Sequence, residues 1–163
     1  MNQTSYYDSI SNAYNELYSE EQLKKCRVIA ENFDFRNKKI LDVGCGTGIA
    51  TEFFHCDTGV EPSKRLLEIA SEKYPSIQFI KASAESLPFN DDEFDAVVSL
   101  TAVQNFDDIE KGLMEIKRVA KEFVLTFMKR SEKRKKIEGL VKKLFKIKKI
   151  IEEEKDLIYL CSK

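Results

Sequence analysis

The stretch Leu41-Asp42-Val43-Gly44-Cys45-Gly46-Thr47-Gly48 decides the fold class of this 163-residue chain. Its first half completes a short apolar run that starts at Lys39, and its second half is a glycine-rich turn. Glycine lets the backbone turn sharply and come within contact distance of a ligand. We expect a helix over about residues 49–55, whose N-terminus would add free N–H groups and a partial positive charge.

Short apolar strands and helices continue to alternate along the rest of the chain. Besides residues 39–43, strands are expected at 58–61, 76–80, 94–99, 123–127, 148–153 and 156–161. Further helices are expected at 63–70, beginning near Pro62, and at 109–120 and 131–146. Continuous apolar strands that alternate with helices indicate a parallel sheet covered on both faces. The predicted fold is therefore an α/β three-layer sandwich, with a mostly parallel seven-stranded sheet that ends in an antiparallel hairpin and helices on both faces.

The composition excludes several classes of protein. The hydrophobic fraction of 42% suffices for one core, and no run of 18 apolar residues could span a membrane. The first residues lack the basic start and apolar stretch of a secretory signal. The four cysteines include no C-x-x-C pair, and His55 is the only histidine, so no metal site is expected. These features predict a cytoplasmic protein with free thiols.

The net charge of −1 conceals an uneven distribution. Residues 129–149 contain 11 basic and 2 acidic side chains, whereas the chain before them is acidic. One interpretation is a solvated helix face on a charge-rich protein. The other is electrostatic attraction of RNA or another anionic partner.

Glu61 ends the second expected strand, 19 residues after Asp42. A carboxylate at this place can accept hydrogen bonds from both hydroxyls of a ribose. A glycine-rich turn alone is often only a tight turn, but together with Glu61 it favours a cofactor that contains a nucleoside. A dinucleotide fingerprint would have its third glycine where this chain has Ile49, which disfavours a nucleotide-dependent oxidoreductase.

In this combination the chain resembles the class I S-adenosylmethionine-dependent methyltransferases, in particular their small "type 11" members. The resemblance rests on five stretches: 41–48, Gly59-Val60-Glu61-Pro62-Ser63, 84–89, 94–99 and 115–119. The start, with Tyr7 and Tyr14, is similar to the small-molecule and tRNA branch of the family. The resemblance implies S-adenosylmethionine as cofactor, S-adenosylhomocysteine as product, and methyl transfer by in-line displacement.

The resemblance also implies roles for particular residues. The backbone of Gly44, Cys45 and Gly46 would hold the methionine part of the cofactor, with Asp42 nearby. Glu61, followed by Pro62, would hold the ribose hydroxyls.

The residues after the third strand, Ser83, Ala84 and Glu85, would cover the adenine. Many relatives have an aspartate in place of Ser83. A serine at this position is expected to form a weaker hydrogen bond with the adenine than an aspartate would. Ser83 has an alternative as the N-cap of a helix. Leu100 is expected to contact the cofactor.

The resemblance assigns no catalytic residue, and Tyr14 and Gln104 are only weak candidates. Gln104 and Asn105 stand where many relatives have two histidines, so Gln104 either faces the site or caps the following helix. Tyr7, Tyr14 and Tyr18 share one helical face and either reach the cofactor or pack in a core.

The chain is interpreted as one methyltransferase domain, residues 1–163. Residues 1–36 form an N-terminal helical cover of two helices, at about 6–18 and 20–33. Residues 37–128 form the cofactor-binding core, and residues 129–163 form a basic helix and a C-terminal hairpin. The acceptor is unknown and could be a small molecule, RNA or protein. The alternative is a cofactor-binding subunit of a hetero-oligomeric methyltransferase that acts on RNA or protein, with little activity alone. The partners considered are a second copy of this chain, in a homodimer, or a small partner subunit.

Overall fold

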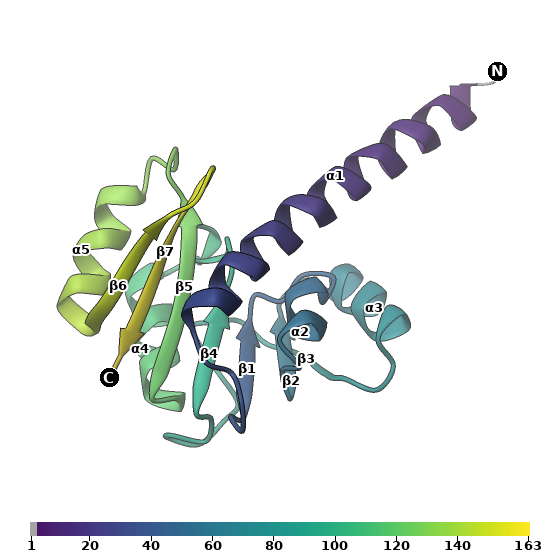
Figure 1. Cartoon of the computed structure of the whole chain (residues 1–163). Helices are drawn as coiled ribbons and strands as arrows, with labels where there is room; N and C mark the ends of the chain where they lie inside the picture. The colour runs from purple at the N-terminus through teal and green to yellow at the C-terminus, as the bar shows by residue number, and fades with distance from the viewer. Residues whose placement is uncertain (1–2) are drawn as a thin grey trace.

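A seven-stranded sheet runs through the whole molecule (Figure 1). The computed structural model describes the backbone of residues 3–163 and the side chains from Asn15 onward. The strands are β1 (Ile40–Val43), β2 (Thr58–Glu61), β3 (Gln78–Lys81), β4 (Ala96–Ser99), β5 (Glu122–Met128), β6 (Lys146–Glu152) and β7 (Asp156–Ser162). Their order across the sheet is β3-β2-β1-β4-β5-β7-β6.

The five strands β1 to β5 are parallel to one another, and the sheet is antiparallel at the end formed by β7 and β6. In the parallel part, Asp42 of β1 pairs with Gly59 of β2 on one side and with Val98 of β4 on the other. At the far end β7 runs antiparallel to both β5 and β6, so the terminal hairpin inserts its second strand next to β5. This confirms the predicted mostly parallel sheet with an antiparallel end.

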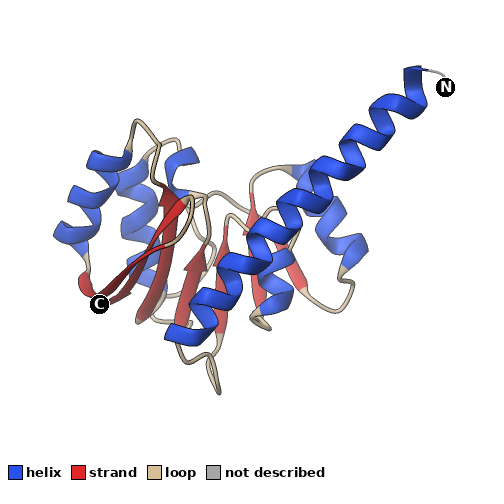
Figure 2. Cartoon of the chain, turned by 45° about the horizontal axis from the view of Figure 1, so that its top comes forward, coloured by secondary structure: helices blue, strands red, loops and turns tan. Residues whose placement is uncertain are grey.

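Helices cover both faces of the sheet (Figure 2). They are α1 (Gln3–Asn32), α2 (Ile49–Phe53), α3 (Lys64–Lys73), α4 (Ile109–Val119) and α5 (Arg134–Leu144), with a 3₁₀ turn η1 (Val103–Asn105) after β4. Strand side chains alternate between the two faces. Leu41, Val97 and Leu125 pack in a core with α4 and α5, whereas Ile40 and Val98 pack in a second core with α1 and α2. The three predicted layers are therefore present.

The first 36 residues differ from the prediction of two helices, because α1 is continuous through Ser19. No glycine or proline interrupts this stretch, and good helix formers follow Ser19, so nothing stops the helix there. Its C-terminal half packs on the sheet through Cys26 and Ile29, whereas its N-terminal half projects away from the body (Figure 1).

Two further expectations about helices were wrong at their ends. The basic helix begins at Arg134 and ends at Leu144, because Lys146 already belongs to edge strand β6. Pro62 precedes α3 without being part of it, since Ser63 is the N-cap and its hydroxyl accepts a hydrogen bond from the Leu66 N–H. In the part of the chain that the structure describes, no helix is both long enough and apolar enough to cross a membrane.

Candidate functional site

The candidate site lies at the carboxyl ends of the parallel strands, between β1 and β4. The chain leaves β1 towards β2 on one side and leaves β4 towards β5 on the other, which opens a crevice between the two loops. A cavity of about 380 Å³ fills this crevice. Its wall comes from the loops after β1, β2, β3 and β4 and includes Gly44, Gly46, Glu61, Pro62, Ser83, Ala84, Glu85, Leu100, Thr101, Ala102, Asn105, Phe106 and Tyr18.

The glycine loop after β1 has a conformation that favours glycine at three positions. Gly44, Gly46 and Gly48 have φ values of 74°, 56° and 87°, in the left-handed region. At Gly44 a Cβ atom would also come within 2.6 Å of the Ala102 Cβ. The loop after β1 therefore touches the loop after β4, and only a glycine allows that approach.

Glu61 ties the second strand to this loop. Its side chain is buried, and its two carboxylate oxygens accept hydrogen bonds from the N–H groups of Gly46, at 3.1 Å, and Ser63, at 2.9 Å. A carboxylate oxygen has two lone pairs, so each oxygen can still accept a bond from a ligand hydroxyl. Glu61 is thus already oriented in the cavity wall before any ligand binds.

Asp42 and Cys45 line a second, small cavity of about 40 Å³, which shares Tyr18, Gly44 and Gly46 with the larger one. The Thr51 hydroxyl of α2 donates a 2.8 Å hydrogen bond to Asp42 Oδ2, and Oδ1 has no partner among the described residues. Burial raises the pKa of the Asp42 carboxyl to about 7, and the nearby charge of Glu61 adds to the rise, while the Thr51 bond opposes it.

The helix after the glycine loop is shorter than expected. Helix α2 has only five residues, and Gly48 caps it in a left-handed conformation without a side-chain hydrogen bond. A helix of this length has a weak dipole, so any ligand at the loop would depend on the loop's own N–H groups.

The segment after β3 forms turns in place of a helix. The Ser86 N–H donates a 3.2 Å hydrogen bond to the Ser83 carbonyl, and no helix follows, so the N-cap interpretation of Ser83 is wrong. Ser83, Ala84 and Glu85 all line the larger cavity. The Glu85 carboxylate also accepts a bond from the Asp108 N–H, which joins this segment to the start of α4.

Gln104 does not line the cavity, and it does not cap α4. Gln104 lies in η1 with its side chain buried, its amide donates a 2.9 Å bond to the Thr101 carbonyl, and its Oε1 has no partner among the described residues. Asp108 caps α4, and Asn105 faces the cavity. Tyr18 lines the cavity, whereas the side chains of the candidate Tyr14, and of Tyr7, lie outside the described residues.

The four cysteines are buried free thiols. Burial raises the pKa of Cys26 and Cys161 to about 12 and raises the pKa of Cys45 and Cys56 as well. A protonated thiol is a weak nucleophile, which agrees with the expectation that Cys45 is a contact residue only. Among residues with described side chains, no group of three His, Cys, Asp or Glu could hold a metal ion.

A buried network beside the site has no signal in the sequence. Lys25 of α1 and Asp156 of β7 form an ion pair at 2.9 Å, with side chains only 7% and 2% exposed. Thr101 and Thr126 both donate hydrogen bonds to the same Asp156 oxygen. The four residues are far apart in the chain, and no local pattern brings them together.

The fold and this site define a methyltransferase. Residues 41–125, just over half of the chain, match the protein family described as "Methyltransferase domain". The chain therefore belongs to the S-adenosylmethionine-dependent methyltransferases, and its cofactor is S-adenosylmethionine.

Two curated relatives and one solved structure show how far the similarity extends. A demethylmenaquinone methyltransferase of Chlorobaculum tepidum is 41% identical over 53% of this chain and 38% of its own length. A ubiquinone/menaquinone biosynthesis C-methyltransferase of Campylobacter jejuni is 30% identical over 67% of this chain and 53% of its own length. The chain thus spans at most about half the length of these relatives.

The solved structure is an S-adenosylmethionine-dependent methyltransferase of Thermotoga maritima, described as a possible histamine N-methyltransferase. The two structures superpose with a TM-score of 0.75, over 96% of this chain and 98% of the Thermotoga chain. Their sequences are only 19% identical. That similarity shows the fold alone.

The residues of the site fit the cofactor. S-adenosylmethionine has a cationic sulfonium and an ammonium group, and Asp42, Glu61 and Glu85 place carboxylates in the walls of the two cavities. The glycine loop leaves open the space that a Cβ would fill. All ten residues that the resemblance implied for cofactor binding lie in the walls of these two adjoining cavities.

Proposed function

We propose that this chain binds S-adenosylmethionine across the two adjoining cavities and transfers its methyl group to an acceptor at the open side between Tyr18 and Asn105. The observation that carries the proposal is the placement of Asp42, Glu61 and the glycine loop around one crevice at the carboxyl ends of β1, β2 and β4. In this arrangement the Asp42 Oδ1 oxygen receives the cofactor's ammonium group, and Glu61 receives its ribose hydroxyls.

The residues after β3 and β4 complete the proposed site. Ser83, Ala84 and Glu85, which would cover the adenine, line the larger cavity, and Leu100 lines both cavities together with Gly44 and Gly46. S-adenosylmethionine, when bound, supplies a methyl group on a sulfonium sulfur that already is a good leaving group. The protein therefore needs mainly to orient the acceptor and to exclude water.

Thermal unfolding with S-adenosylhomocysteine tests this proposal directly. A ligand that binds only the folded state stabilises it by about 2.7 kcal/mol at one hundred times its Kd. We expect millimolar S-adenosylhomocysteine to raise the Tm by several degrees. NAD, which the position of Ile49 disfavours, serves as the matched nucleotide control and leaves the Tm unchanged. No shift with S-adenosylhomocysteine would contradict the proposal.

For the acceptor we propose a ring of the quinone class. The two curated relatives act, by their names, on demethylmenaquinone and in ubiquinone and menaquinone biosynthesis. The side chains of Leu100, Ala102 and Phe106 in the cavity wall offer an apolar surface that suits an uncharged ring. Incubation with methyl-labelled S-adenosylmethionine and demethylmenaquinone should label the quinone, while label in RNA or protein fractions would overturn this choice.

The second candidate is a cofactor-binding subunit that acts through a partner. The observation in its favour is that Gln104, a candidate catalytic residue, does not line the cofactor cavity. Its signature is a clear Tm shift with S-adenosylhomocysteine and no methyl transfer to quinone, RNA, protein or metabolite fractions by the protein alone. Activity of the isolated chain on any one of these fractions would exclude it.

A further inference from the structure

Four polar side chains from four elements meet at the edge of the sheet where α1 leaves the body. The Lys25 ammonium contacts Asp156 Oδ2 at 2.9 Å and also donates a hydrogen bond to the Thr101 hydroxyl. The hydroxyls of Thr101 and Thr126 donate to the same Asp156 oxygen, at 2.7 and 3.1 Å. Lys25, Thr126 and Asp156 are all buried, so the charges of the pair are neutralised within the protein.

Thr101 has a backbone conformation that this network must hold. Its φ is 54°, in the left-handed region, which is rare and strained for a β-branched residue. The Thr101 N–H donates to Thr126 Oγ1 at 2.8 Å and to the Thr126 carbonyl at 3.1 Å. Both the backbone and the hydroxyl of Thr101 are therefore fixed by residues of other elements.

Thr101 separates two cavities. On one side is the cofactor cavity, and on the other is a cavity of about 260 Å³ whose wall includes Gln22, Lys25, Met128 and Asp156. The next residue, Ala102, approaches Gly44 of the glycine loop so closely that no Cβ would fit there. A shift of Thr101 would therefore move the wall of the cofactor cavity, although Thr126 itself lines neither cavity.

We propose that Lys25, Thr126 and Asp156 are positioning residues that hold Thr101, and with it the loop Leu100–Ala102, in the conformation that binds the cofactor. The network makes the cofactor affinity depend on Lys25 of α1 and Asp156 of β7, although neither of these residues lines the cofactor cavity. The inference rests on the proposed cofactor site.

The variant Thr126→Val tests the network with little change in shape. It removes the hydroxyl that holds the Thr101 N–H and donates to Asp156, and it keeps the backbone bond. We expect the Kd for S-adenosylhomocysteine, measured by isothermal titration calorimetry at a temperature where both proteins are fully folded, to rise about five- to tenfold. Hydrogen exchange at the Thr101 amide should accelerate, while exchange at Val97 in the core should not change.

Two further variants keep the test decisive. Thr126→Ser retains the hydroxyl and should restore the affinity to within about twofold of the wild type. Thr58→Val makes the same change at a buried threonine that begins β2, at the end of the strand away from the cofactor cavity. It should leave the Kd unchanged. Each of three results would overturn the inference. They are an unchanged Kd in Thr126→Val, an equal loss of affinity in Thr126→Val and Thr126→Ser, and an equal loss of affinity in Thr58→Val and Thr126→Val. If the wild type itself fails to bind S-adenosylhomocysteine, the proposed function fails instead.

Discussion

At the residue scale, Asp42 links protonation to both stability and binding. Because burial raises the pKa of its carboxyl to about 7, the folded state prefers the protonated form. The unfolded chain ionises near the ordinary pKa of an aspartate, about 3.9. The contribution of Asp42 to stability is therefore fully present below about pH 4 and is lost as the pH rises to about 7. A cationic group beside Oδ1 would reverse this preference.

The variant Asp42→Asn should remove this pH dependence. Without ligand, it should be more stable than the wild type at pH 8 by up to about 4 kcal/mol, the free energy that corresponds to a carboxyl pKa of about 7 in the folded protein and about 3.9 in the unfolded chain, and the difference should shrink at pH 5. Its affinity for S-adenosylhomocysteine at pH 8 should fall more than tenfold, because the amide cannot pair with the ammonium group. Thermal unfolding and calorimetry at both pH values measure the two effects.

Glu52→Gln is the matched control for Asp42→Asn. Glu52 is exposed on α2, and its side chain has no partner among the described residues. The variant Glu52→Gln should leave both the pH dependence of stability and the affinity for S-adenosylhomocysteine unchanged. An Asp42→Asn protein that binds as tightly as the wild type at pH 8 would show that Asp42 does not contact the ammonium group.

Gly44→Ala should damage both stability and binding. The new Cβ meets Ala102 at 2.6 Å, and the φ of 74° is strained for any residue with a side chain. We expect a loss of about 1–3 kcal/mol in the free energy of unfolding and a large loss of affinity for S-adenosylhomocysteine. Chemical denaturation and calorimetry measure these changes.

Gly139→Ala provides the comparison, since Gly139 lies in α5 with no atom near its missing Cβ. That change should stabilise the protein by up to about 1 kcal/mol. The double variant Gly44→Ala/Ala102→Gly should recover only part of the loss, because it relieves the close contact but not the backbone strain. Full recovery would show that the left-handed φ at residue 44 costs little free energy when the residue is alanine.

At the scale of elements, the strands were easier to predict than the helices. Each central strand is buried on both faces and is therefore a largely apolar run bounded by turns, as in Val97–Val98 and Phe123–Leu125. The start of the chain has no such signal. Ser19 has the chemistry of an N-cap, and only the continuous backbone of α1 shows that it does not act as one.

Ser19→Ala distinguishes a continuous α1 from two helices. Within a continuous helix alanine is favoured over serine, so we expect a gain of up to about 0.5 kcal/mol in the free energy of unfolding. If Ser19 capped a second helix, the same change would cost about 1 kcal/mol. Thermal unfolding followed by circular dichroism at 222 nm decides between the two signs, and Ser19→Gly should be destabilising in either case.

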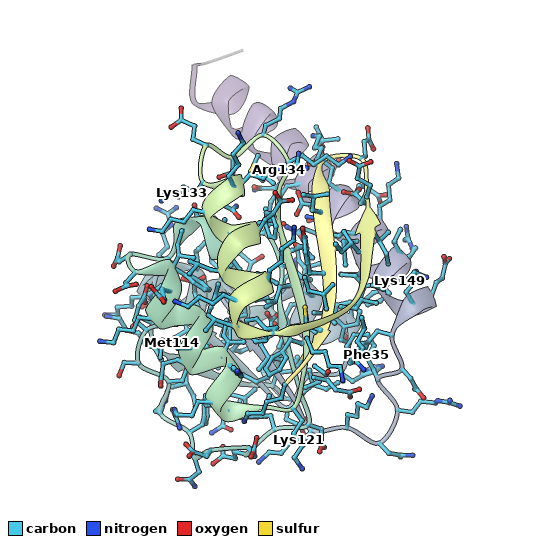
Figure 3. The ribbon with its side chains drawn as sticks, turned by 90° about the vertical axis from the view of Figure 1, so that its left-hand side faces the viewer. Phe35, Met114, Lys121, Lys133, Arg134 and Lys149 are labelled. Atoms are coloured by element: carbon cyan, nitrogen blue, oxygen red, sulfur yellow. The ribbon has the colours of Figure 1, made fainter. Side chains whose placement is uncertain are left out.

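At the scale of the whole molecule, charge is distributed between two sides. The carboxylates of the cavities lie at the carboxyl ends of the strands. Basic residues are frequent in α5 and edge strand β6, and Figure 3 shows Arg134 of α5 and Lys149 of β6 on this side of the molecule. Some of these residues are paired, as Lys143 is with Glu110. Five exposed lysines of this basic face have no partner among the described residues: Lys135, Lys136, Lys142, Lys146 and Lys148. Lysines along β6 also protect an open sheet edge from pairing with another strand.

Charge reversal tests whether the basic face attracts a polyanion. We expect the variant K142E/K146E/K148E to bind single-stranded RNA at least about tenfold more weakly at low salt, and its log Kd to depend less steeply on log salt by about two units. S-adenosylhomocysteine binding is the internal control and should not change, because none of these lysines lines the cofactor cavity. Equal RNA binding and salt dependence in both proteins would show that the basic face is only a solvated surface.

The sequence by itself indicated the fold and a cofactor that contains a nucleoside, and its resemblance to a known family indicated S-adenosylmethionine. The apolar runs, the glycine turn and Glu61 are local patterns, because strand burial, sharp turns and the acid after β2 each depend on residues close together in the chain. It also indicated ten of the residues that line the two cavities.

Only the tertiary structure decided what surrounds that site. It placed Gln104 behind the cavity wall, gave Ser83 a turn, and joined Lys25 to Asp156 across 131 positions of sequence. It also held Thr101 at a positive φ. No local pattern encodes these features, because each depends on contacts between elements that meet only when the sheet assembles.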